Sequence, residues 1–240
     1  MNEVDSLKYL GLHLAATVEK SIETTVNQRI GLATRAVFEI RTVIENTRAE
    51  CIGAIETGMN LFESSVLPMI LFGSESWGLV DQKVLQKLDS LNVLFLASIL
   101  GVSRRGTPAV SLYLETASLK MENRILLNQL LFYHFLITLS NDSLAKEFFL
   151  EQKKESFPSL FNQCEQLLTE WSINTETIHF YTKNAWKNKM KQLIKRRNHL
   201  QLIEWCKSYK KIDFQKYVNN DFEMQPYLKD MNLCDSRTIF

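Results

Sequence analysis

The sequence predicts a mainly α-helical protein: a multi-helix bundle with one short N-terminal strand or hairpin and a helical C-terminal extension. Apolar residues recur every three or four positions through most of the chain, which is the period of a helix buried on one side. All eight glycines lie at or before Gly106, and only four prolines occur, so few turns with positive φ are expected in residues 107–240. With 45% hydrophobic and 23% charged residues, the chain should fold around a sizeable core.

Residues 6–15, SLKYLGLHLA, depart from the helical pattern. Leu7 and Tyr9 alternate with Lys8 and Leu10, which predicts a short strand or half of a hairpin. Because a single strand is not stable alone in water, we expect it to pair with something outside this chain or to fray. This is a first indication that the sequence is part of a larger protein.

Helical periodicity then covers three segments, residues 18–46, 50–72 and 82–100. Pro68 should bend the second segment because it lacks an N–H and collides with the preceding turn. Asp81 is a suitable N-cap for the third, and Gly101 is a natural stop after it.

The rest of the chain predicts further helices with short connections. Thr107 should cap a short helix that has Pro108 at its first position and ends near residue 115. Others are expected at residues 119–139, 142–154 and 158–171. The sequence of residues 175–181 does not indicate which secondary structure they form. Thr182 should cap a long basic helix, which a break near Asn198 would interrupt, and the tail from residue 213 holds two short elements around Pro226.

The stretch 66–77, VLPMILFGSESW, combines apolar residues with special ones. Gly73 allows either positive φ or close approach of another backbone, and Glu75 would need a partner if it were buried. Trp77 offers a large apolar surface with one hydrogen-bond donor. We interpret the stretch as a kinked core helix and its exit turn, which fixes neighbouring helices and touches no substrate.

Motifs for metal or nucleophilic chemistry are missing from the sequence. The eight aspartates are scattered without an Asp-Asp or Asp-x-Asp pair, and no C-x-x-C, G-x-S-x-G or glycine-rich phosphate loop occurs. His134 lies in an apolar helix and is expected to be a hydrogen-bonded core residue. We therefore expect no catalytic residue, no metal site and no cofactor in this chain.

Targeting and membrane signals are also missing. The acidic N-terminus has no apolar h-region, and the longest uncharged run, residues 125–141, is too short to span a bilayer. We expect an intracellular protein, nuclear or cytoplasmic, that is not inserted in a membrane.

Positive charge is concentrated in one segment. Residues 183–211 hold ten lysines and arginines and one glutamate, although the whole chain has a net charge of only +1. The predicted basic helix buries a stripe that includes Trp186 and should present four cations in a row on its other side, namely Lys183, Lys187, Lys191 and Lys195. Like charges at this spacing repel and destabilise the helix, so an anionic partner such as nucleic-acid backbone would reduce this repulsion. A solvated helix face is the equally weighted alternative.

Other cations could join this site. Arg196 and Arg197 follow the row, and a nuclear-localisation role for Lys195, Arg196 and Arg197 is a weaker alternative. Arg104 and Arg105 precede the N-terminus of the short helix at Pro108, where their charge and the helix dipole would suit a phosphate. A solvated turn explains that arginine pair equally well.

The order and spacing of several short motifs resemble one family, the reverse transcriptases of non-LTR (LINE-type) retrotransposons. The resemblance covers about residues 5–140 and rests on Tyr9-Leu10-Gly11, Val66-Leu67-Pro68, Phe72-Gly73-Ser74-Glu75-Ser76-Trp77, Ile99-Leu100-Gly101-Val102, Thr107-Pro108, Leu112-Tyr113 and Glu115. It implies a palm-edge strand, then a helical thumb that grips the template–primer duplex, then a helical connector. Ala117 stands near a position where the family commonly has glycine.

The family's catalytic aromatic-x-Asp-Asp motif should precede Tyr9, and this sequence does not contain it. The resemblance therefore implies a fragment that binds RNA and DNA but is inactive alone; the intact family enzyme would use Mg²⁺. Its expected parts are residues 1–16 (palm edge), 17–140 (thumb-like domain), 141–182 (connector) and 183–240 (basic region).

Two alternatives remain at this point. One is a non-catalytic interaction domain whose basic helix docks an acidic protein partner. The other is a nucleic-acid-processing enzyme with an unrecognised site.

Overall fold

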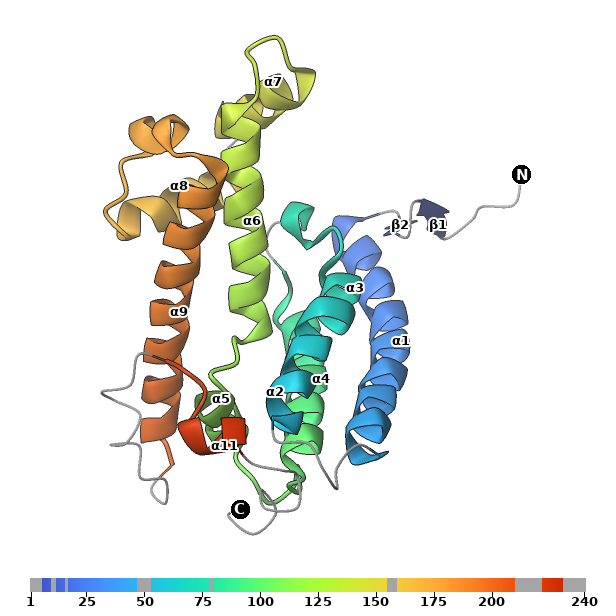
Figure 1. Cartoon of the computed structure of the whole chain (residues 1–240). Coiled ribbons are helices and arrows are strands. Elements are labelled where there is room, and N and C mark those ends of the chain that lie inside the picture. Colours follow the sequence, from blue (N-terminus) through green and yellow to red (C-terminus); the bar gives the residue numbers. More distant parts are fainter. Residues whose placement is uncertain are drawn as a thin grey trace, which may run out of the picture. The chain divides into compact units, whose positions relative to one another are not determined.

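The computed structural model describes residues 6–9, 12–15, 17–46, 53–77, 80–154, 159–209 and 222–230 (Figure 1). Within these ranges the chain is mainly α-helical with one short hairpin, which confirms the predicted fold class. The chain separates into two compact units. The first contains Met1–Ile22, Phe72–Gln82 and Glu122–Ile194, and the second contains Glu23–Leu71, Lys83–Met121 and Lys195–Phe240.

The N-terminal strand pairs within the chain. Strand β1 (Ser6–Tyr9) and strand β2 (Leu12–Ala15) are antiparallel, with Tyr9 opposite Leu12. The expectation of a strand without an internal partner is therefore wrong, because residues 12–15 form a second strand that pairs with residues 6–9. No third strand joins this sheet among the described residues. Gly11 and the Tyr9 side chain lie outside the described part.

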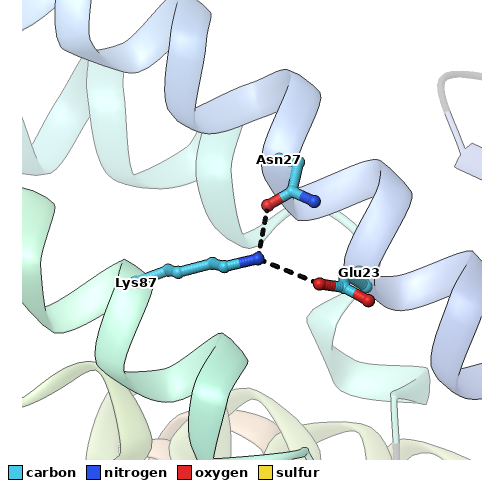
Figure 2. A network of polar contacts seen from close by, with 3 residues as sticks. All are labelled: Glu23, Asn27 and Lys87. Atoms are coloured by element: carbon cyan, nitrogen blue, oxygen red, sulfur yellow. Dashed lines mark hydrogen bonds and ion pairs between the residues drawn. The ribbon is translucent and has the colours of Figure 1, made fainter.

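In the second unit, helix α1 (Val18–Asn46) packs beside helix α4 (Gln82–Leu100). Both helices have the bounds that the sequence predicts. Figure 2 shows a polar link between them: the Lys87 ammonium donates to Glu23 Oε1 at 2.9 Å and to Asn27 Oδ1 at 3.0 Å. These side chains are about half exposed, so the ion pair contributes less than ~1 kcal/mol. Burial of apolar residues therefore dominates this helix contact.

The predicted bent helix is a continuous helical path with a π-turn. Helix α2 (Ala54–Leu61) leads into a π-helical segment, η1 (Phe62–Val66), and then helix α3 (Leu67–Leu71). The Leu67 N–H donates to the Phe62 carbonyl, five residues earlier. Pro68 has no N–H to offer residue 64 and its ring would collide with that carbonyl, so the widened turn accommodates it. The distortion thus precedes Pro68.

Helix α2 approaches its neighbours closely at a glycine. A side chain at Gly58 would collide with Ile44 of α1 and Ile99 of α4. One turn further along, the Phe62 ring stacks on Phe95 of α4, with ring centroids 3.9 Å apart. The core of the second unit is built where these three helices meet.

Helix α4 stops as the sequence predicts, but the next cap differs. Gly101 adopts φ 71°, and Val102 N–H donates to the Ala97 carbonyl at 3.0 Å, as in a glycine-terminated helix. Helix α5 (Ala109–Thr116) has Pro108 at its N-cap, without a side-chain cap. The predicted Thr107 cap is wrong because the helix begins one residue later, with the Ser111 N–H donating to the Pro108 carbonyl at 3.0 Å.

The remaining elements follow the predicted order: α6 (Met121–Thr138), α7 (Leu144–Glu151), η3 (Gln152–Lys154), α8 (Leu160–Glu170), η4 (Thr175–Phe180), α9 (Lys183–Lys207) and α11 (Pro226–Asp230). The ambiguous segment is thus a 3-10 helix. Thr182 caps α9, since its hydroxyl accepts from the Ala185 N–H at 3.2 Å. The rest of the predicted tail lies outside the described residues.

Helix α9 does not break at Asn198. The Asn198 side chain is fully buried, and its Oδ1 accepts from the Lys120 N–H at 2.9 Å. Because the amide bonds to the α5–α6 connection, it does not compete for the backbone of its own helix.

Asp89 and Asn92 of α4 hold the same connection. Asp89 Oδ1 accepts from the Tyr113 hydroxyl and from the Met121 N–H, both at 2.9 Å, and Asn92 donates to the Leu119 carbonyl at 3.1 Å. These bonds require a sharp turn directly after α5.

That turn uses positive φ in the part of the chain without glycine. Ala117 has φ 50°, and Ser172 and Phe222 are also positive. The expectation that such turns are scarce after residue 107 therefore missed three described positions. At Ala117 the polar bonds that follow hold the turn despite the strain of this conformation.

We predict that Ala117→Gly stabilises the protein by about 0.5–1 kcal/mol, because glycine adopts this conformation without a Cβ clash. The measurement is the midpoint of urea unfolding. The control is Ala185→Gly, at an exposed helical position of α9, which should cost about 0.5–1 kcal/mol. Equal losses at both positions would contradict strain at Ala117.

Candidate nucleic-acid interface

In the first unit, α9 is held against α6 by Trp186. The indole is fully buried, and its Nε1–H donates to the Leu130 carbonyl of α6 at 2.9 Å. The His134 ring stacks against Trp186 with centroids 5.2 Å apart. Met190 and Ile194, at four-residue intervals, continue the fully buried stripe. This packing fixes which side of α9 faces solvent.

Lys183, Lys187 and Lys191 are exposed along α9 in the first unit. Lys187 directly follows buried Trp186, and one residue is a rotation of about 100° around a helix. The lysine row therefore flanks the buried stripe; it is not on the opposite side, as the sequence suggested. These three lysines form no ion pair or hydrogen bond within the described part of the chain.

Lys189 behaves differently from this row. Its ammonium donates to the Tyr181 hydroxyl at 2.7 Å and lies 4.7 Å from the centre of the Tyr181 ring. Lys189 is thus engaged within the fold, whereas Lys183, Lys187 and Lys191 remain available as a cationic row on α9.

The other predicted cations lie in the second unit. Lys195 and Arg196 continue along α9 and are exposed, whereas Arg197 is half-buried. Arg104 and Arg105 are exposed in the turn that the Gly106 N–H closes on the Ser103 carbonyl. We therefore build the candidate site from the first unit's three lysines.

A pocket of about 670 Å³ opens beside Lys183 and Lys187. It lies between α6, η4 and the start of α9, all in the first unit. Its lining combines aromatic, polar and charged side chains: Glu75, Asn128, Leu131, Phe132, His134, Phe135, Thr138, His179, Tyr181, Lys183, Trp186 and Lys187.

His134 is a neutral group in this pocket at neutral pH. Its side chain is only 5% exposed, and its Nε2 lies 3.1 Å from the Tyr181 carbonyl oxygen. Burial lowers the pKa of His134 below its ordinary value of 6.5, although the contact with the carbonyl opposes this. The prediction of a hydrogen-bonded core histidine is confirmed.

The residues of the 66–77 stretch have different surroundings. Pro68 is exposed, Gly73 has φ 77° with the Leu12 side chain packed on it, and Trp77 is only 6% exposed. Glu75 is half-buried and lines the pocket. Of the residues predicted to be structural, Glu75 is thus accessible to a ligand.

Several pocket residues had no signal in the sequence. Asn128, Phe135 and Tyr181 come from α6 and from the end of η4, and α6 is apolar on most of its surface. Periodicity alone could not show which α6 side chains remain open to solvent. The exposed Phe135 could be found only once the partner of α6 was known.

Two buried cysteines are unsuited to nucleophilic chemistry. Burial raises the pKa of Cys164 to about 12, and it also raises the pKa of Cys206, so both are protonated thiols at neutral pH. Among the described residues, no three His, Cys, Asp or Glu side chains gather as a metal site would require. We therefore assign no Mg²⁺ position.

None of the described helices combines the length and apolar character needed to cross a bilayer.

Comparison of the chain with protein-family models, curated proteins and solved structures finds no match.

We predict that His134 makes the protein less stable as the pH falls from about 6.5. The unfolded state keeps the ordinary pKa and binds a proton that the folded state resists, so the loss approaches ~1.4 kcal/mol per pH unit between the two pKa values. Thermal unfolding between pH 7.5 and 5.0 measures this.

His134→Phe should flatten that pH dependence, because it removes the group whose pKa burial lowers. An identical slope in His134→Phe and the wild type would show that His134 does not resist protonation.

Proposed function

We propose that this chain binds the phosphate backbone of nucleic acid through Lys183, Lys187 and Lys191 of α9. The observation that supports this best is that these three side chains are exposed, aligned and without a partner in the described part of the chain. Successive members are separated by a helical rise of about 6 Å. An anionic polymer laid along α9 would neutralise all three.

The fixed orientation of α9 favours binding of nucleic acid along its lysine row. The buried Trp186–Leu130 hydrogen bond fixes the rotation of α9 about its axis, so the lysine row is presented in one direction. Such contacts position a nucleic acid but do not read its sequence. We accordingly propose binding to duplexes of any sequence, with an affinity that falls as salt increases.

The resemblance to non-LTR retrotransposon reverse transcriptases supplies the biological setting of the proposal. The chain would act as the thumb and connector that grip an RNA–DNA template–primer. Because the sequence has no Asp-Asp pair, we propose that the chain alone does not extend a primer. Polymerisation and its Mg²⁺ would belong to carboxylates that this sequence does not contain.

One observation favours a second function, docking of an acidic protein partner. Three large apolar side chains of the first unit are strongly exposed: Leu144 at 69%, Phe148 at 71% and Phe180 at 78%. Exposed apolar surface marks protein–protein interaction sites where it forms a contiguous patch. This alternative predicts indifference to an RNA–DNA hybrid even at low salt.

Replacing Lys187, Lys191 and Lys195 by glutamine should weaken binding to an RNA–DNA hybrid and make the slope of log K against log salt shallower by up to about three. The measurement is fluorescence anisotropy at several salt concentrations. Lys195 is included because it continues the exposed row on α9.

The control variant carries Lys20→Gln, Lys83→Gln and Lys229→Gln, which remove the same charge at exposed positions that do not belong to α9. It should keep nearly the wild-type slope. Equal losses in both triple variants would mean that only net charge matters and would contradict a site on α9.

A further inference from the structure

We propose that the pocket beside Lys183 and Lys187 receives the base of an unpaired nucleotide, while the two lysines hold its adjoining phosphates. This inference rests on the proposed nucleic-acid binding and adds a preference for strands that contain an unpaired residue. All of the groups it uses belong to the first unit.

The size and walls of the pocket suit a planar aromatic ligand. Its volume of about 670 Å³ is within the range of small-molecule sites. Phe135 is 53% exposed, and its ring lies nearly parallel to Phe132, with centroids 6.1 Å apart and planes 18° apart. The open face of Phe135 is a surface on which any base can stack.

Polar groups in the lining can meet the edge of a base. Asn128 donates from Nδ2 to the Ser74 hydroxyl at 2.9 Å, while its carboxamide oxygen accepts no hydrogen bond in the described part of the chain. The half-buried Glu75 carboxylate likewise has no partner there. Both oxygens can accept from the amino or imino N–H groups of a nucleobase.

Charge in the pocket selects a nucleotide over an acidic peptide. The Glu75 carboxylate would repel a carboxylate side chain that entered the pocket, but it would accept hydrogen bonds from a neutral base. The anionic part of the ligand must therefore lie against Lys183 and Lys187, which line the same pocket and have exposed side chains. A nucleotide meets both requirements when its neutral base lies beside Glu75 and its phosphates lie beside the two lysines.

The test compares two RNA–DNA hybrids that are identical except for one unpaired 2-aminopurine in the first. Binding is measured by anisotropy, and stacking by the fall in 2-aminopurine emission. The wild type should bind the hybrid with the unpaired base about tenfold more tightly, which is within the range that one stacked base contributes. Its emission should fall on binding.

Thr138→Trp should fill the pocket and remove the preference without changing affinity for the fully paired hybrid. Thr169→Trp is the matched control. Both threonines are exposed, near the end of a helix, and donate to the carbonyl four residues earlier at 2.8 Å, but only Thr138 lines the pocket. The control should keep the preference.

Phe135→Leu provides a second variant that keeps apolar bulk but removes the aromatic face, and it should also lose the preference. If the wild type binds both hybrids equally and the emission does not change, the base pocket is refuted while backbone binding stands. If neither hybrid binds at low salt, the proposed function fails and this inference fails with it.

Discussion

The candidate site depends on one buried hydrogen bond, from the Trp186 indole to the Leu130 carbonyl of α6. A backbone carbonyl has a second lone pair, so Leu130 can accept this bond without losing its place in the helix. The His134 ring stacks on the indole, and the Tyr181 ring is inclined to the indole by 63°, with ring centroids 5.7 Å apart. A buried donor leaves the fold few alternatives, because an unpaired indole N–H in the core would be costly.

Two consequences follow for the surface of the first unit. The rotation of α9 places Lys183, Lys187 and Lys191 on the flank of the buried stripe, where they are exposed. The same packing leaves a pocket between α6 and the start of α9, and Lys183 and Lys187 are part of its lining. Cations and aromatic walls thus occur together because one indole sets the position of one helix.

The sequence predicted those features that are encoded locally. Helix periodicity located α1 and α4, and Gly101 and Thr182 identified helix ends because caps use residues next to them in the chain. Features set by distant partners were missed. The pocket depends on which side of the apolar helix α6 faces α9, and the positive φ of Ala117 depends on bonds from Asp89 to Met121 and Asn92 to Leu119.

Lysine footprinting tests the central claim most directly. The chain is acetylated with and without an RNA–DNA hybrid at low salt, and each lysine is quantified by mass spectrometry. The account predicts strong protection of Lys183, Lys187 and Lys191 by the hybrid, with exposed Lys20 and Lys83 reacting equally in both samples. Unchanged acetylation of the three α9 lysines under conditions where the hybrid is bound would contradict it.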